Sequence, residues 1–132
     1  MKFGFILIAS LMISSLHAGD AHYDCTIKNV YEINDEGALV KESKKIEDIY
    51  KGTFSISRLT GDIVGRTMPT TNASQKLVIN PGNSEWSFKA LSIYEHPNGN
   101  EFNGIEVLEY REGLEKPFYA ISVAGVISGT CK

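Results

Sequence analysis

The chain has 132 residues, 13 of them basic and 16 acidic, and its formal net charge is −3 at pH 7. This length allows one domain with a modest core and is too short for two. The charge is weak and its signs are interspersed, whereas nucleic-acid binding needs a basic surface that neutralises phosphates. We therefore expect a single small body that does not bind nucleic acid.

Residues 1–18 have the composition of a secretory signal peptide. Lys2 gives a positive start, an apolar run follows, and Ala18 or Ala21 precedes the cleavage site. We expect cleavage after Ala18, with Ala21 as the alternative, and a single β domain over residues 19–132. Cleavage after Ala18 removes one charged residue, Lys2, and leaves a formal charge of −4.

The same segment bears on localisation. Its apolar run is too short to span a bilayer, and no later stretch approaches spanning length. A lipid-anchored protein would need a cysteine next to the cleavage site, and neither site has one. We therefore expect a periplasmic or secreted protein without a stable membrane anchor.

The residues after the signal peptide predict a β-hairpin. Within residues 23–33 the odd-numbered positions, including Cys25 and Ile27, share one phase, which is typical of a half-buried strand. Residues 34–37 have turn chemistry, and residues 38–42 resume as the partner strand.

Two further elements follow. The lysine-containing segment 40–51 predicts a solvated loop or edge strand, and within it residues 44–51 have the best helical spacing, enough for a short cap on a barrel end. Residues 53–68 predict a second hairpin, because Phe54 and Ile56 alternate with polar residues before a Thr-Gly-Asp break.

The middle of the chain predicts two more strands. Residues 76–79 form a short strand that a proline–glycine turn ends. In residues 86–94 the apolar phase changes after Phe88, which we interpret as a β-bulge near residues 89–90 that bends the strand. We expect Trp86, the only tryptophan, to lie buried in the phase of Phe88.

A strand over residues 105–110 and a final strand over residues 117–131 complete the pattern. The total is about seven to eight strands with short turns. This pattern predicts an all-β fold, a small antiparallel barrel or sandwich, and a bent strand suits the barrel.

The two cysteines lie on the first and last of these strands. Cys25 shares its phase with Ile27, and Cys131 shares its phase with Tyr119 and Ile121, so both thiols are expected to point inward. In an oxidising compartment two such cysteines most simply form one disulfide. A catalytic thiol pair would need Cys-x-x-Cys spacing, which the sequence lacks.

The sequence shows no motif of an enzyme, a cofactor site or a metal site. It has no Gly-x-Ser-x-Gly elbow, Walker loop, Rossmann glycine motif or EF-hand pattern. Zinc needs three or four ligands, and the cluster of His22, Asp24 and Cys25 falls short of such a set. Glu106 and Glu109 would point to opposite faces of a strand, which does not suit glycosidase chemistry. We therefore expect a protein that is not an enzyme and carries no cofactor or metal.

The layout of the chain resembles that of the periplasmic inhibitors of c-type lysozyme. The features in common are a signal peptide, a Tyr-x-Cys opening at Tyr23 and Cys25, and a C-terminal cysteine, Cys131, on a small β-body. The Ser-Gly-x-x-Tyr inhibitory loop of that family has no match, because no tyrosine follows Ser128 and Gly129. The resemblance assigns no inhibitory residue.

The remaining functional class is binding. We expect an exported, non-enzymatic protein that binds a protein partner in the cell envelope, as an inhibitor or immunity protein against an envelope-directed hydrolase. One alternative is a small-molecule or lipid-binding barrel carrier with Trp86, Phe88, Phe118 and Tyr119 around a cavity. The other is a structural envelope protein.

Loops carry function on rigid β-scaffolds, and residues 95–104 form the longest connection with varied chemistry. We expect a partner to contact His96, Asn98 and Phe102 there. The alternative is that Phe102 begins the next strand and packs on the core, which would make this segment a plain hairpin connection.

Overall fold

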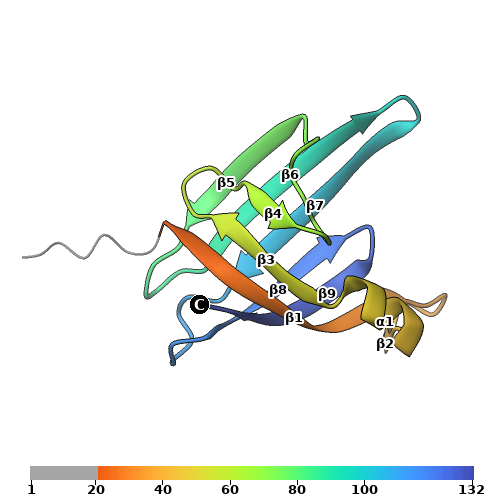
Figure 1. Ribbon diagram of the computed structural model, residues 1–132, viewed down its shortest axis with the longest axis horizontal. Coiled ribbons are helices and arrows are strands. Elements are labelled where there is room, and N and C mark those ends of the chain that lie inside the picture. The colour runs from red at the N-terminus through yellow and green to blue at the C-terminus, as the bar shows by residue number, and fades with distance from the viewer. Residues whose placement is uncertain (1–20) are drawn as a thin grey trace, which may run out of the picture.

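The computed structural model describes residues 21–132, and the predicted signal peptide lies outside these residues. The described part is nearly all β-structure with one short helix (Figure 1). Its elements are β1 (His22–Ile33), β2 (Leu39–Lys41), α1 (Lys44–Tyr50), β3 (Gly52–Ser57), β4 (Ile63–Gly65), β5 (Gln75–Pro81), β6 (Phe88–His96), β7 (Gly99–Val107), β8 (Lys116–Ser122) and β9 (Gly125–Cys131).

All these strands belong to one antiparallel sheet. The strand order is β4-β3-β1-β9-β8-β7-β6-β5, and β2 pairs with the C-terminal part of β1. The sheet coils into a half-barrel, so that β1 and β3 cross in front of β6 and β7 in Figure 1. The predicted all-β antiparallel class is confirmed, and the half-barrel decides between barrel and sandwich.

Local sequence accounts for the first two hairpins. Residues 34–37 join β1 to β2, where the Asn34 side chain accepts a hydrogen bond from the Ala38 N–H at 2.8 Å and Gly37 adopts a φ of +80°. The second hairpin is β3–β4, and Gly61 supplies its positive φ. Both predicted hairpins are confirmed.

The segment between these hairpins contains the short helix α1. Ser43 caps it by accepting a hydrogen bond from the Ile46 N–H. Glu47 is 7% exposed and forms ion pairs with Lys51 and Lys41. The hydrogen bond from Lys51 lowers the pKa of Glu47 more than burial raises it. The helical alternative for this segment is therefore correct.

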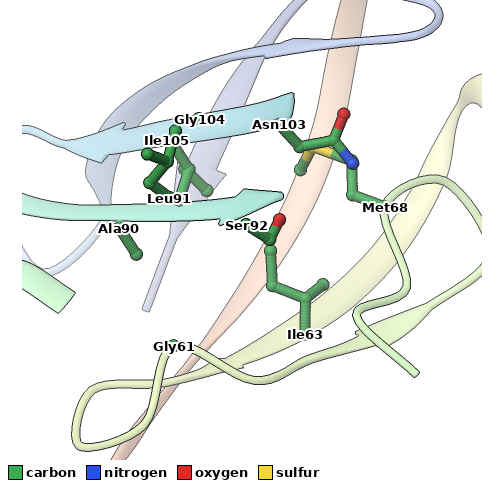
Figure 2. Close-up of a pocket in the computed structure, with 9 residues that line it drawn as sticks. All are labelled: Gly61, Ile63, Met68, Ala90, Leu91, Ser92, Asn103, Gly104 and Ile105. Carbon is green, nitrogen blue, oxygen red and sulfur yellow. The ribbon is translucent and has the colours of Figure 1, made fainter. Parts of the chain in front are cut away.

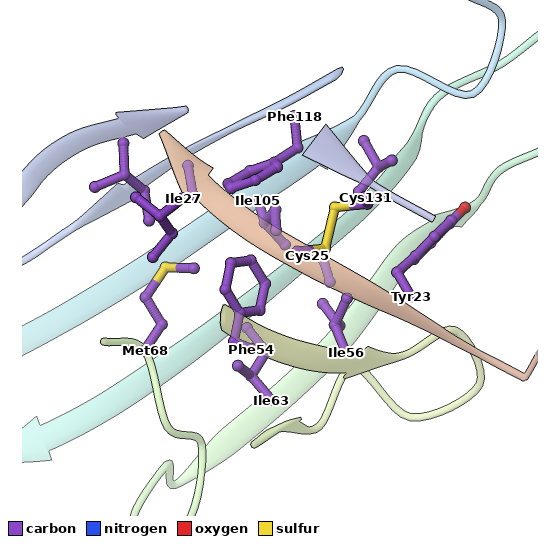
Figure 3. Close-up of a cluster of buried hydrophobic side chains, with 14 of the residues drawn as sticks. Tyr23, Cys25, Ile27, Phe54, Ile56, Ile63, Met68, Ile105, Phe118 and Cys131 are labelled. Atoms are coloured by element: carbon purple, nitrogen blue, oxygen red, sulfur yellow. A yellow bond between two sulfur atoms is a disulfide. The ribbon is translucent and has the colours of Figure 1, made fainter. Parts of the chain in front are cut away.

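The disulfide joins the first and last strands of the chain. Cys25 and Cys131 are directly opposite each other on β1 and β9, with their Cα atoms 3.9 Å apart, and both are fully buried (Figure 3). The backbones of Asp24 and Lys132 exchange two hydrogen bonds, so the cysteines occupy a non-hydrogen-bonded pair, where strands approach most closely. The predicted bond is confirmed, and it fits an oxidising compartment.

The core fills the inside of the half-barrel. Phe54 and Phe118 meet edge to face with their ring centroids 5.4 Å apart, and Tyr23 and Phe88 do the same at 5.3 Å. Figure 3 shows Tyr23, Phe54 and Phe118, from β1, β3 and β8, around the disulfide. The internal pocket beside Met68 has no space for a water molecule. The interior is therefore occupied by protein side chains.

The predicted phase of β1 holds only for its first half. Tyr23, Cys25 and Ile27 are buried as expected, but the register with β9 shifts between Ile27 and Asn29. The extra residue at this bulge moves the inward phase to Val30, which is fully buried. The odd-numbered residues of β1 beyond the bulge, which are predicted to point inward, therefore face outward.

The predicted bulge in β6 is wrong. The strand pairs with β7 without interruption from Phe88 to His96, and the irregularity lies in the facing strand β5, between Val78 and Asn80. The prediction that Trp86 is buried is also wrong, because its side chain is 63% exposed. The Trp86 N–H donates to the Asn83 side chain in the turn before β6, so the tryptophan precedes the strand and does not share its alternation.

The predicted last strand is a hairpin. Its two strands, β8 and β9, join at residues 123–124, and Phe118 and Ala120 face inward on β8. Tyr119 is 44% exposed and Ile121 is 47% exposed, so their predicted inward orientation is wrong, whereas that of Cys131 is correct. With Trp86 and Tyr119 outside, two of the four aromatic residues expected around a central cavity do not face the interior.

Side chains close the gap between the edge strands β4 and β5. Lys76 of β5 forms a hydrogen-bonded ion pair with Asp62 in the β3–β4 turn, and Gly61 beside it packs against Val78 and Ala90. The hydrogen bond from Lys76, followed by one from a neighbouring threonine, lowers the pKa of Asp62. This contact brings the ends of the sheet together without a backbone ladder.

We predict that reducing the disulfide destabilises the protein strongly. The bond spans 106 positions, and in the chain-entropy model a loop of that size stabilises by up to about 4.7 kcal/mol. A Cys25→Ser and Cys131→Ser double variant should show a much lower urea midpoint than the oxidised protein. Thiol labelling of the denatured, unreduced protein should detect no free thiol, and labelling of both cysteines would contradict the bond.

We predict that Asp62 stabilises the fold only above acidic pH. Its lowered pKa means that the folded state favours the carboxylate, so the gain is complete above the unfolded pKa of about 3.9 and disappears as pH falls through the folded pKa. Asp62→Asn should cost at most about 1 kcal/mol at pH 7, because the pair is partly exposed, and nothing near pH 2. Asp35→Asn, in an exposed turn, is the control; an equal effect of both variants would argue against the bridge.

Candidate functional site

The structure corrects the expected docking loop. Residues 95–104 belong almost entirely to the β6–β7 hairpin, in which His96 pairs with Gly99 across a two-residue turn. Gly99 has a φ of +135°, a conformation that glycine adopts without strain. The alternative of a plain hairpin connection is therefore correct, and the prediction of a long loop is wrong.

The three predicted site residues do not come together. His96 lies on the inner side of the hairpin and its ring is 3.8 Å from the Glu101 carboxylate. Asn98 is exposed at the tip, and Phe102 lies on the outer side, directly opposite Ile93. The alternative is correct that Phe102 belongs to the next strand, β7, which begins at Gly99, but Phe102 is 55% exposed and does not pack on the core.

Phe102 belongs to an apolar surface on the outside of the sheet. Leu77, Leu91, Gly104 and Ile121 form one cross-strand row over β5, β6, β7 and β8, and Ile93 and Phe102 form the next row. Directly opposed residues share a face of a sheet. Leu77, Phe102 and Ile121 are each about half exposed. We call Leu77, Leu91, Ile93, Phe102 and Ile121 the outer patch.

The missing side chain at Gly104 shapes this surface. A Cβ at that position would be 3.8 Å from the Leu91 side chain, so Leu91 lies over the glycine between Leu77 and Ile121. Figure 2 shows Leu91 beside Gly104 on the neighbouring strand. Next to Leu91, the surface has a depression of about 420 Å³, lined by Leu91, Ile93 and Phe102 among others. The apolar side chains of the outer patch therefore adjoin one another, and the surface beside Phe102 is concave.

The two ends of the outer patch differ in charge. At one end Glu106 accepts hydrogen bonds from Ser87 and Tyr119 and lies 3.7 Å from the Lys89 ammonium. Burial raises the pKa of Glu106, but these hydrogen bonds outweigh it and lower the pKa overall. At the other end, the hairpin tip carries Glu95 and Glu101 with one histidine between them in sequence. The patch thus runs from a neutralised carboxylate to an acidic tip.

A second feature lies on the inner side of the hairpin, at the open end of the half-barrel. This end cleft has a volume of about 430 Å³. It is lined by Thr67, Pro69, Thr71, Asn72, Tyr94, His96, Glu101, Asn103 and Val123. Of the predicted site residues, only His96 lines it.

A buried polar side chain, Asn103 of β7, forms the floor of the end cleft. Ser92, which pairs with Asn103, and Ser122, one position beyond the registered Gly104–Ile121 pair, are also buried but do not line the cleft. Figure 2 shows Ser92 and Asn103 on adjacent strands in the internal pocket that adjoins the cleft. The inward face therefore changes from apolar near the disulfide to polar at the cleft.

Asn103 has an unsatisfied oxygen. The residue is 9% exposed, and its Oδ1 has no hydrogen-bond partner among residues 21–132. Its Nδ2 lies 3.5 Å from the Tyr94 hydroxyl, which in turn donates to the Pro69 carbonyl at 2.8 Å. A buried acceptor without a donor costs roughly 1–3 kcal/mol. Because a small domain rarely carries such a cost, Asn103 at the floor of the cleft is a candidate binding position.

The other polar clusters have structural explanations. Arg58 stacks over the Tyr23 ring and lies 3.4 Å from the Glu109 carboxylate, which accepts a hydrogen bond from the Tyr23 hydroxyl. Burial, followed by that hydrogen bond, raises the pKa of Tyr23. These mutual contacts account for the cluster without a bound ligand.

The N-terminal histidine cluster lacks a third ligand. His22 lies 3.7 Å from Asp24, but Cys25 is bonded in the disulfide and its sulfur cannot act as a thiolate. Over residues 21–132 there is no group of three or more histidine, cysteine or acidic residues arranged to hold a metal ion.

Comparisons of the chain with protein-family models, with curated proteins and with solved structures found no match. In the described part of the chain, no helix has the length and apolar character needed to cross a membrane.

Both surfaces have a signal in the sequence. The change of apolar phase at Leu91 and Ile93 reflects the outer patch and not the predicted bulge. The polar floor follows from the opposite phase of the same strand, in which Ser92, Tyr94 and His96 succeed buried Phe88. A strand with apolar residues in both phases is a signal for an exposed apolar face.

We predict that Phe102 contributes little to stability. Phe102→Ala should lower the free energy of unfolding by less than about 1 kcal/mol, because the ring is more than half exposed. Phe118→Ala is the matched control, since Phe118 is 2% exposed, and it should cost about 3–5 kcal/mol. Urea denaturation measures both. Equal losses would place Phe102 in the core.

Proposed function

We propose that the protein is an exported binding protein that contacts a folded protein partner in the cell envelope through the outer patch. The observation that carries this proposal is the apolar face of β5 to β8, with Leu77, Phe102 and Ile121 about half exposed. Contiguous apolar surface of this kind marks interaction sites in soluble proteins. The disulfide supports an oxidising compartment such as the periplasm or the exterior.

The charges suggest what such a partner looks like. The hairpin tip beside the patch carries two carboxylates, Glu95 and Glu101, and the chain without residues 1–18 has a formal charge of −4. Complementary charge speeds association and selects the partner. We therefore expect a contact surface that is apolar at its centre and basic at its rim. A second copy of the chain would bring the same negative charge to the interface and fits less well.

The proposed role is that of an inhibitor or immunity protein against an envelope-directed hydrolase. Surface contact suits this role, since inhibition requires only that the partner's site be covered. The filled interior beside Met68, without space for a water molecule, gives less support to the alternative of a carrier with a central ligand cavity. The role of a structural envelope protein needs no exposed apolar depression beside Phe102.

We predict that partner capture depends on the outer patch. The test compares a Leu77→Ala and Phe102→Ala double variant with a Leu59→Ala and Leu114→Ala control. The control removes leucines outside the patch that are even more exposed, at 80% and 95%. Each protein is immobilised and exposed to envelope extract, and bound proteins are identified by mass spectrometry. The patch variant should lose at least tenfold in capture of one hydrolase, and the control should retain it.

A photoreactive phenylalanine at position 102 locates the contact. It should cross-link to the captured hydrolase, and the purified protein should lower that hydrolase's activity in proportion to complex formed. Three results would overturn the proposal: equal capture by patch and control variants, cross-links only to a second copy of the chain, or capture without any effect of raising the salt concentration.

A further inference from the structure

The end cleft has the properties of a second binding site. It lies on the inner side of the β6–β7 hairpin, lined by Tyr94 and Asn103, whereas the outer patch residues Ile93 and Phe102 lie on the opposite side of the same strands. An inference about the cleft therefore goes beyond the proposed function and does not depend on it.

Hydrogen bonding assigns the oxygen and the nitrogen of the Asn103 amide in the free protein. The Tyr94 hydroxyl has one proton, which it donates to the Pro69 carbonyl, so towards Asn103 it acts as an acceptor for Nδ2. Exchanging the oxygen and nitrogen of the amide would set two acceptors against each other. Among the described residues, Oδ1 therefore has no protein donor and is available to accept a hydrogen bond from a bound molecule.

The lining limits the charge of that molecule. The described residues around the cleft include no lysine or arginine, and the one carboxylate, Glu101, has His96 as its ionic neighbour at 3.8 Å. An anionic ligand would meet Glu101 without a compensating cation. A purely apolar ligand would cover the Asn103 amide without satisfying its oxygen. A neutral ligand with hydroxyl groups avoids both costs.

We propose that the end cleft binds a neutral sugar. Sugar hydroxyls donate to Asn103 Oδ1 and exchange hydrogen bonds with Thr71 and Asn72, while the C–H face of a ring packs on Tyr94 and Val123. The cleft volume of about 430 Å³ lies within the range of about 300–1,000 Å³ that ligand pockets occupy. Because Oδ1 is buried, binding requires the amide to turn towards the cleft about its soft terminal torsion, which gives up the long 3.5 Å contact between Nδ2 and the Tyr94 hydroxyl.

Nuclear magnetic resonance titration of the ¹⁵N-labelled oxidised protein tests the proposal. The probes are two neutral disaccharides, chitobiose and maltose, with glycerol as the polyol control and inorganic phosphate as the anionic control. At least one disaccharide should shift the side-chain amide signals of Asn103 and the backbone signals of Thr71 and Asn72. Absence of shifts with both disaccharides, equal shifts with glycerol, or binding of phosphate alone would each overturn it.

Variants assign the site to particular side chains. Asn103→Ala should weaken disaccharide binding at least tenfold. Asn72→Ala should weaken it severalfold. Because Asn72 is exposed, this second variant still tests the site if Asn103→Ala does not fold. Asn98→Ala, at the hairpin tip outside the cleft, is the matched control and should bind normally. Phe102→Ala should also bind normally, so a failure here is distinct from a failure of partner docking. Unchanged binding in both cleft variants would overturn the proposal.

Discussion

The pairing of β1 with β9 is the contact on which the rest of the fold depends. Every other strand pair joins neighbours within β1 to β4 or within β5 to β9, so among the described residues this is the only hydrogen-bonded strand pair between the two halves of the sheet. Contacts so distant along the chain form against a large loop-closure entropy. The disulfide between Cys25 and Cys131 removes much of that entropy from the unfolded chain, exactly where the two halves meet.

Local signals allowed the hairpins and the disulfide to be predicted from the sequence. Period-two alternation and turn residues such as those at 34–37 act over a few positions, and a pair of inward cysteines needs only the correct phase near each end. The gap closed by Asp62 and Lys76 could not be predicted, because it depends on how far the sheet coils. Coiling is a property of the assembled strands and not of any one segment.

The errors arose where the phase of a strand was ambiguous. In β1 a bulge moved the buried phase to Val30, and nothing in the local sequence marks the inserted residue. In β6 and β8 both phases contain apolar residues, so alternation alone does not tell which face is inside. His96 and Phe102 are both exposed, but their separation onto opposite sides of a hairpin follows from pairing in register, which the sequence pattern does not give.

The two candidate surfaces share a physical character, since each includes a feature that folding does not require. A half-exposed Phe102 gains little from burial, and an unsatisfied Asn103 oxygen costs stability in a small domain with a narrow margin. Sequences depart from local folding rules mainly at functional positions. The covalent β1–β9 junction lies away from the hairpin tip, and the stability it adds is independent of both surfaces. A fold anchored in this way tolerates an apolar outer face and a polar inner face on the same hairpin. Alternate residues of β6 and β7 can then contact two different binding partners.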